Sequence, residues 1–299
     1  MKNIFGNRWF LLIILALTWG SSFIMIKKSL LEFSPYEIGS LRVLISGIIL
    51  SMIGIPVIRK MNRVTLFYVA LAGLFGNFLP LYLFPMAQTH ISSSLAGVLD
   101  SLVPIFVLIL GFLFYGVKTQ ISQIFGAIIG FFGAATLMYF SESNTEETQI
   151  GYALMVVFAT VCYAVAALII KDKLSKLTSI ELTASMFTLW AIPALVILLS
   201  SGFTKNHNFD YETLTAFGFV SILAIFGTTI AIVLYYKLIQ DTSPIFASSV
   251  SYLLPIFAVM WGLIDGEKFS PWYIFSGVLI LIGVYLIREK KKKPKMVPR

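Results

Sequence analysis

The chain contains an internal repeat that can be seen by eye. Residues 95–106 (LAGVLDSLVPIF) align without a gap with residues 246–257 (FASSVSYLLPIF), and the match extends over 75–111 and 226–262. One half of the protein is therefore a copy of the other. When each half of an apolar chain crosses a membrane an odd number of times, the two halves lie in opposite orientations, as in many secondary transporters.

The composition indicates a membrane protein. The mean hydropathy is +0.91, and 58% of the residues are apolar whereas only 12% are charged. Both values lie far outside the range of soluble globular domains. We therefore interpret the net charge of +8 as a sign of membrane orientation and not of nucleic-acid binding.

The apolar residues divide into ten stretches, each close to the 20 or so residues that a membrane span needs. This pattern predicts an all-α membrane protein with ten transmembrane helices in two inverted five-helix repeats. The first repeat covers residues 1–145, the second covers 146–288, and 289–299 form a basic cytoplasmic tail. The predicted spans are 9–27, 36–58, 65–87, 92–115, 121–140, 151–170, 180–200, 213–236, 244–264 and 271–288.

The basic residues predict the orientation. With ten spans both termini lie on one side of the membrane, and Lys and Arg are concentrated on cytoplasmic sides. Seventeen Lys and Arg residues lie on the side of the termini and four on the other. We therefore expect a multi-pass protein of the inner membrane with both termini in the cytoplasm. Glu37, which opens the second span outside, has its counterpart Glu181 at the start of the seventh span inside, as inversion requires.

Asp100 is the only acid deep inside a span, about 12 Å from its start at 1.5 Å per residue. A carboxylate at that depth is costly, and intramembrane acids commonly carry function. One interpretation is a residue that couples transport to protons or binds an amine. The other is a protonated carboxyl that only hydrogen-bonds a neighbouring helix.

Arg42 is the only basic residue inside a span. We expect its long stem to carry the guanidinium out to the outer surface, which is typical of a structural or topological role. Asp100 is an alternative partner for it from another helix. We expect no Lys or Arg at the midplane, which argues against strongly anionic substrates.

Other polar residues also fall near the midplane. Trp19 offers a flat ring either to a substrate or to core packing, and Tyr163 occupies the matching place in the second half. Asn77 and Thr228 each follow a Phe-Gly pair. The two copies differ in three such pairs: Asp100 and Ser251, Asn77 and Thr228, and Ser101 and Tyr252.

Two prolines, Pro104 and Pro255, occupy equivalent positions in the fourth and ninth spans. A proline in a helix removes an N–H donor and clashes with the preceding turn, so we expect kinks there. Matched kinks in two inverted halves indicate a central binding site.

Motifs for energy-driven or catalytic chemistry are absent from the sequence. It has no phosphate-binding Walker loop, no dinucleotide-binding glycine pattern, no metal-ligand spacing and no nucleophile elbow. We therefore expect neither an enzyme nor an ATP-driven pump, and no cofactor or metal.

These residues resemble the EamA-type branch of the drug/metabolite transporter superfamily. The resemblance covers about residues 9–288 and is carried by WGSSF at 19–23, Arg42 with Leu44, PIF at 104–106 and 255–257, and glycine-rich fifth and tenth spans. It implies a central cavity lined by spans 1, 3, 4, 6, 8 and 9, with spans 5 and 10 outside. The lining residues that it implies are Trp19, Ser22, Asn77, Asp100, Tyr163, Thr228 and Tyr252. Val103 and Leu254 stand where the family often has Glu, so any role of that acid does not carry over.

The sequence therefore predicts a secondary transporter that exports small metabolites, amino acids or amphiphilic compounds by alternating access. Its expected partners are a small-molecule substrate, membrane lipid and, through Asp100, protons, in a monomer or homodimer. A membrane sensor or assembly protein without flux and an uncoupled uniport facilitator are the alternatives.

Overall fold

The structure is a computed structural model that describes residues 7–91, 93–117, 119–140, 150–203, 207–208, 210–264 and 271–287. All regular secondary structure in these ranges is helical. The basic tail predicted at 289–299 lies outside the described residues, as does the loop at 141–149. The helices of the first half are α1 (Arg8–Gly20), α2 (Ser22–Ser29), α3 (Pro35–Lys60), α4 (Arg63–Gly73), η2 (Leu74–Phe78), α5 (Leu79–Gln88), α6 (Ser93–Asp100), α7 (Val103–Tyr115) and α8 (Ile121–Tyr139). Those of the second half are α9 (Ile150–Lys173), α10 (Ser179–Ser200), α12 (Tyr211–Ile222), η3 (Leu223–Ile230), α13 (Ala231–Asp241), α14 (Pro244–Ser248), α15 (Val250–Ile264) and α16 (Pro271–Ile287).

Seven helical stretches are long and apolar enough to cross a membrane. They are Arg8–Ser29, Pro35–Lys60, Arg63–Gln88, Leu95–Tyr115, Ile150–Lys173, Ser179–Ser200 and Tyr211–Asp241. The other three expected stretches contain shorter apolar helices, described over Ile121–Thr136, Pro244–Phe257 and Pro271–Ile287.

Two of the long helices begin with the same device in both halves. Ser34 caps α3 and Thr178 caps α10, and each side chain accepts a hydrogen bond from the backbone N–H of a glutamate three residues later. Each glutamate, Glu37 or Glu181, in turn accepts a bond from the backbone N–H of its cap. This reciprocal capping box fixes where a helix starts, and here it starts equivalent spans of the repeated sequence.

Several spans are interrupted near their middle. The first changes from α1 to α2 at Ser21, and the fourth changes from α6 to α7 at Ser101 and Leu102. The stretches Arg63–Gln88 and Tyr211–Asp241 contain the π-helical segments η2 and η3. These segments include the equivalent sequences Phe75-Gly76 and Phe226-Gly227. π-Helical turns are rare in proteins, and those that occur are frequently found at functional sites.

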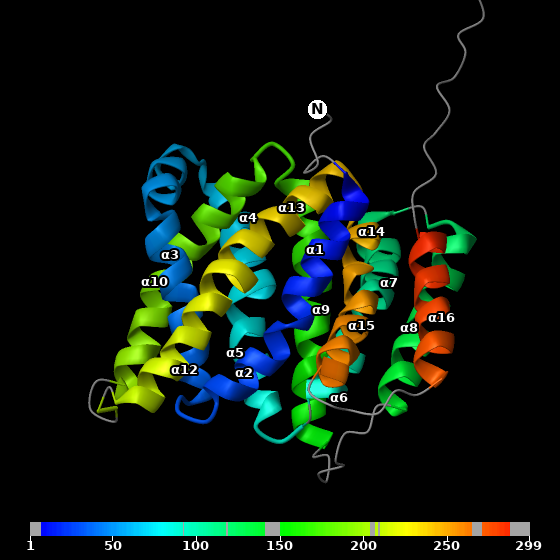
Figure 1. The fold of residues 1–299 in the computed structure, drawn as a ribbon. Helices are drawn as coiled ribbons and strands as arrows, with labels where there is room; N and C mark the ends of the chain where they lie inside the picture. Colours follow the sequence, from blue (N-terminus) through cyan, green and yellow to red (C-terminus); the bar gives the residue numbers. More distant parts are fainter. Residues whose placement is uncertain are drawn as a thin grey trace, which may run out of the picture.

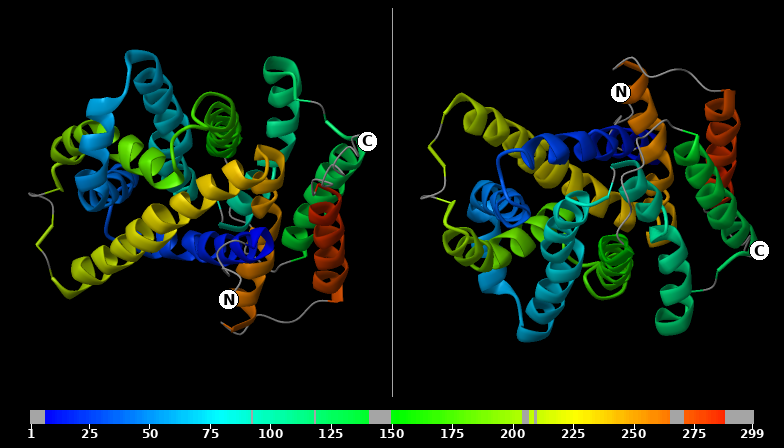
Figure 2. Two further views of the ribbon diagram at one scale, coloured as in Figure 1. Left: turned by 90° about the horizontal axis from the view of Figure 1, so that it is seen from above. Right: turned by 90° about the horizontal axis from the view of Figure 1, so that it is seen from below.

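The helices form a bundle with a pair at each edge. Figures 1 and 2 show α3 beside α10 at one edge and α8 beside α16 at the other, and these two pairs make the most extensive helix contacts. Between them α1, α9, α13 and α15 form the centre. In Figure 1 α1 begins at the end of the bundle where α9 finishes, so the two helices run in opposite directions.

Glycines allow α8 and α16 to touch along their backbones. A Cβ atom added at Gly283 would lie 2.6 Å from the Cα of Gly130 and 2.8 Å from the carbonyl oxygen of Gly126. Small residues at such contacts let membrane helices approach closely. By contrast, a Cβ added at Gly277 of the same helix would meet nothing within 4 Å.

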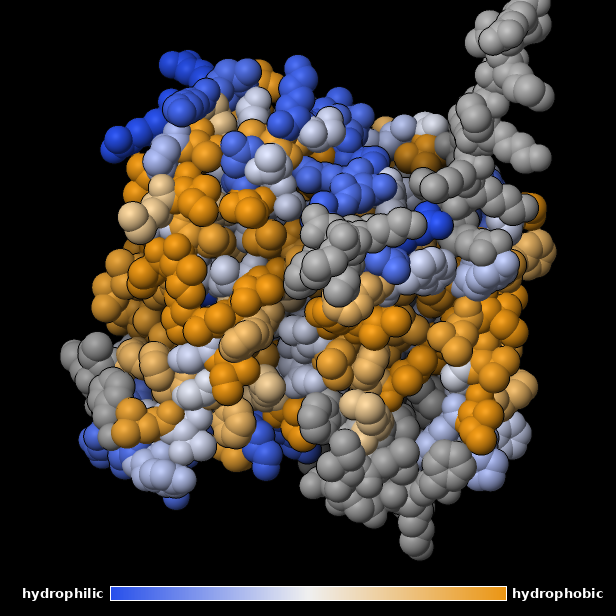
Figure 3. Space-filling view, turned by 45° about the horizontal axis from the view of Figure 1, so that its top comes forward, coloured by the Kyte–Doolittle hydropathy of each residue, from blue (hydrophilic) through white to orange (hydrophobic). Residues whose placement is uncertain are grey.

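The outer surface is apolar in a band around the bundle. In Figure 3 hydrophobic residues cover the middle of the visible face, and hydrophilic ones gather at its two ends. Large apolar side chains such as Ile48, Met52 and Leu199 are exposed. Such a surface suits the hydrocarbon core of a bilayer.

The contact between α8 and α16 provides a stability test. We expect Gly283→Leu to lower the free energy of unfolding by about 1–3 kcal/mol, because overpacking forces the helices apart. Gly277→Leu, which faces open space, is the matched control and should leave the melting temperature of the detergent-solubilised protein nearly unchanged. Equal melting temperatures for the two variants would contradict the packing described here.

Candidate functional site

A cavity of about 100 Å³ lies in the centre of the bundle. Since a buried water needs roughly 10–15 Å³ of such space, the cavity has room for several waters or a small solute. Its walls come from α1, α2, α3, η2, α5, α6, α7, α9, η3, α13 and α15, whereas α8, α10 and α16 contribute none of the lining. The polar lining residues are Trp19, Ser22, Arg42, Asp100, Tyr163, Tyr235, Tyr236 and Ser251; the others are Phe23, Ile26, Gly76, Pro80, Leu81, Phe84, Val103, Ala166, Ala167, Gly227, Ile232, Val250 and Leu254.

Trp19 and Ser22 enter the wall on either side of the break between α1 and α2. The Trp19 Nε1–H donates to the carbonyl oxygen of Gly227 in η3 at 2.8 Å, and its ring meets Tyr235 edge-on at 5.1 Å between centroids. Gly20, directly after the tryptophan, lies against α15, where a Cβ would sit 2.8 Å from the Cβ of Phe257. The break thus lets α1 pack closely while its indole satisfies a backbone carbonyl of another helix.

Asp100 lies at the last residue of α6, where the fourth span is interrupted. Its side chain is buried and lines the cavity beside Ser251, whose hydroxyl lies close enough to interact with the carboxyl group. Positions 100 and 251 are equivalent in the repeated sequence, so the two copies meet each other here. The carboxyl group therefore has a neutral hydroxyl partner inside the protein.

The sequence predicts that the side chain of Arg42 extends to the outer surface, and this prediction is wrong. Arg42 is only 6% exposed, lines the cavity, and its Nε–H donates to the Thr228 hydroxyl at 3.1 Å. The physical reason is its face on α3, where Gly39 and Ser46 lie one turn away on either side and are also buried. No ion pair joins Arg42 to Asp100 or to another acid among the described residues.

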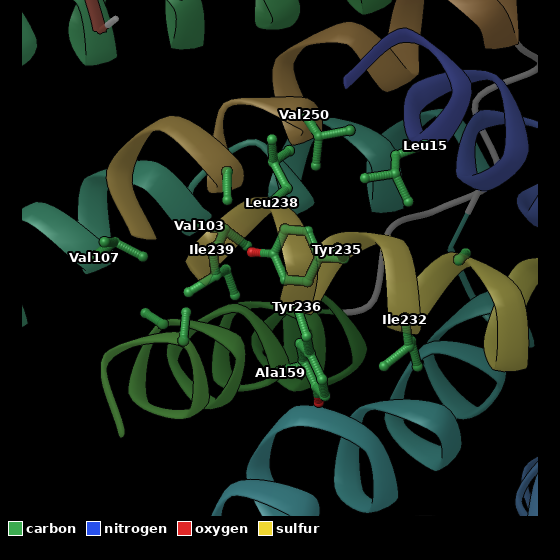
Figure 4. Packing of buried hydrophobic residues seen from close by; sticks show 14 of the residues in the cluster. Leu15, Val103, Val107, Ala159, Ile232, Tyr235, Tyr236, Leu238, Ile239 and Val250 are labelled. Carbon is green, nitrogen blue, oxygen red and sulfur yellow. The ribbon is translucent and has the colours of Figure 1, made fainter. Parts of the chain in front are cut away.

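Three tyrosines complete the polar wall. Tyr163 of α9 lies close enough to interact electrostatically with both Asp100 and Arg42. Figure 4 shows Tyr235 and Tyr236 of α13 pointing in different directions among buried aliphatic side chains. The Tyr236 hydroxyl donates to Asn77 Oδ1 at 3.1 Å, which joins α13 to η2.

The structure places the predicted residues in two groups. Trp19, Ser22, Asp100 and Tyr163 line the cavity together. The other four lie outside its lining and have partners in the bundle. Asn77 bonds Tyr236 and Met186, Ser101 bonds Val98, Thr228 bonds Leu223 and Arg42, and Tyr252 bonds Ala127.

The two prolines have different surroundings. Pro104 occupies the first turn of α7, directly after the interruption that ends α6. Pro255 instead lies inside α15, and the interruption of the ninth span comes earlier, at Ser249. The two prolines occupy equivalent positions in the sequence, but only Pro104 directly follows an interruption of the helix.

Sequence reasoning missed Arg42, Tyr236 and Ser251 as lining residues. For Arg42 a signal was available, because its neighbours Gly39 and Ser46 mark a polar, close-packed face of the span. For Ser251 the signal was that it aligns with Asp100 in the internal repeat. Within the described part of the chain, no group of three or more His, Cys, Asp or Glu side chains could hold a metal.

Comparison with known proteins relates the chain to transporters. The model of the EamA-like transporter family matches residues 8–139 and 150–288. An uncharacterized transporter of Archaeoglobus fulgidus is 29% identical over 95% of this chain and 100% of its own length. The uncharacterized inner membrane transporter YedA of Escherichia coli K12 is 26% identical over 92% of this chain and 91% of its own length.

A solved crystal structure shares the fold. It superposes with a TM-score of 0.71 over 92% of this chain and 94% of that chain, at 16% sequence identity. Together with the apolar helices, the family match and the named relatives identify a multi-pass membrane protein related to transporters.

Cysteine labelling can test whether the cavity admits water. In a Cys162→Ala background, which removes the only cysteine, we expect Ser22→Cys to react with a small polar thiol reagent at least about tenfold faster than Ser101→Cys, because a thiol must be accessible to react. Ser22 lines the cavity, whereas Ser101 is fully buried outside it. Equal labelling rates, followed by mass spectrometry, would contradict this placement.

Proposed function

We propose that this chain, which belongs to the EamA-like transporter family, is a secondary transporter that exports small metabolites, amino acids or amphiphilic compounds across the bacterial inner membrane. The single observation that carries the proposal is the central cavity, which combines aromatic and aliphatic walls with Asp100 and several hydroxyl groups. Binding sites for small molecules are typically concave and apolar, with a few polar groups that fix orientation. In this proposal the protein interacts with the solute, the surrounding lipid and the coupling proton. It functions as a monomer or a homodimer.

The transporter consists of ten spans in two inverted five-helix repeats. Movement of these repeats opens the cavity first to one side of the membrane and then to the other. The contacts of two equivalent glycines support this symmetry. A Cβ on Gly76 would lie 2.9 Å from the Ala166 Cβ, and one on Gly227 would lie 3.0 Å from the Ser22 Oγ. Ser22 and Ala166 are themselves counterparts, so the same contact is made once in each direction between the halves.

Both termini face the cytoplasm in this proposal. Helix ends on the side where α1 begins carry eight of the described basic residues, whereas Lys27 and Lys28 are at the other side. Positive charge collects on the cytoplasmic side. The eight residues are Arg8, Arg59, Lys60, Arg63, Lys171, Lys173, Lys176 and Lys237.

Asp100 couples transport to protons. Within the described lining of the cavity it is the one acidic residue, and its contact with Ser251 leaves it without a fixed counter-charge. A buried carboxyl with a neutral partner takes up and releases protons according to its surroundings. Solute binding and the change of access then alter those surroundings in each cycle.

The experiment that tests this function begins with the solute. Comparing the media of deletion and overexpression strains by metabolomics identifies the exported compound, and everted vesicles then measure its uptake. We expect Asp100→Asn to remove most of the pH dependence of this uptake, because the amide does not titrate.

Asp172→Asn is the matched control, since Asp172 is an exposed acid at the end of α9 that pairs with Lys173. It should retain the pH dependence of the unmodified protein. Uptake by Asp100→Asn with an unchanged pH dependence would refute the coupling, and the absence of any transported solute in purified proteoliposomes would favour a sensor.

A further inference from the structure

Arg42 is held in one orientation by its hydrogen-bond partner. The Thr228 hydroxyl donates its proton to the Leu223 carbonyl at 2.9 Å, so it offers a lone pair to the Nε–H of Arg42. Leu223 and Thr228 both belong to η3, where the wider π-helical turn brings a hydroxyl and a carbonyl five residues apart into contact. One edge of the guanidinium is thereby fixed at Thr228, and Arg42 lines the cavity.

The rest of the guanidinium makes no hydrogen bond in the described part of the protein, and Tyr163 interacts with it only electrostatically. A guanidinium carries five N–H donors in a planar fork, but its bond to Thr228 is the single hydrogen bond that Arg42 makes with the described residues. A buried charge is unfavourable unless it is paired and hydrogen-bonded. The cavity therefore contains a fixed cation whose remaining donors are available to a ligand.

A carboxylate is the group that fits these donors best. Its two oxygens match the spacing of the guanidinium fork, which gives a strong bidentate pair. The apolar wall, with Phe23, Ile26 and Phe84, suits an aliphatic or aromatic body. Asp100 in the same cavity disfavours ligands with two or more negative charges, such as phosphate esters.

We propose that Arg42 is the residue that binds the carboxylate of the transported solute, and that the solute is a small organic carboxylate with at most one net negative charge. This proposal rests on the function proposed above and names the substrate class of the same cavity. It also makes Thr228 a positioning residue, because it orients the guanidinium without touching the solute.

Binding to the purified protein in lipid nanodiscs tests the proposal. The ligands are phenylacetate, isovalerate, phenylalanine and leucine, each compared with its carboxamide, and binding is measured by the ligand-dependent shift of the melting temperature and by calorimetry. We expect carboxylates to bind and carboxamides to bind about 10- to 100-fold more weakly, the range that corresponds to losing a charge-assisted hydrogen bond. If no carboxylate binds, or if the carboxamides bind equally well, the proposal is overturned.

Variants of α3 assign the binding to Arg42. Arg42→Gln should weaken carboxylate binding by a similar factor and leave carboxamide binding as it is, whereas Arg42→Lys should recover part of the loss. Arg59→Gln, which removes an exposed cation of the same helix, is the matched control and should bind as the unmodified protein does. Thr228→Val, which keeps the guanidinium, serves as a second variant if Arg42→Gln does not fold, and should show an intermediate loss; unchanged binding would overturn the proposal.

The result can be separated from the fate of the transport proposal. If a carboxylate binds through Arg42 but proteoliposomes move no solute, the site stands and the transport function fails. If a solute is transported but its flux is the same in Arg42→Gln and the unmodified protein, transport stands and the role of Arg42 fails.

Discussion

The hydrocarbon core of a membrane offers no water to backbone carbonyls that an interrupted helix leaves unpaired, so each interruption needs a donor from within the bundle. In this protein the Trp19 indole donates to Gly227 inside η3, and the Thr228 hydroxyl donates to Leu223. At the end of α13, the Lys171 ammonium donates to the backbone carbonyl oxygens of Ile239, Gln240 and Thr242. The interruptions that shape the cavity are stable because these donors lie beside them.

The same constraint governs the charged side chains. Arg42 and Asp100 are kept away from lipid and face one internal space, where a hydroxyl group lies beside each of them. Elsewhere the described helices present aliphatic and aromatic side chains outward (Figure 3) and glycines to each other. The bundle thus places both Arg42 and Asp100 on the wall of the same cavity.

Length and hydropathy sufficed to predict where the apolar helices lie, and the repeat predicted which of them correspond. Trp19, Ser22, Asp100 and Tyr163 could be selected because each is polar and near the middle of a span. The directions of side chains could not be predicted in the same way. Neighbours in a helix point about 100° apart, so Ser251 faces the cavity while Tyr252 faces α8, and the additional residue of a π-helical turn rotates all that follows. The hydrogen-bond partner of Arg42, Thr228, lies in such a π-helical segment.

The contact between Asp100 and Ser251 joins unlike groups at equivalent positions of the repeated sequence. If the two copies of the repeated sequence were identical here, two aspartates, or two serines, would meet at this place. Two carboxylates at hydrogen-bond distance cannot both be ionised, and two hydroxyls carry no charge. Because the two copies differ here, the carboxyl group of Asp100 has a neutral hydroxyl beside it instead of a second carboxyl group.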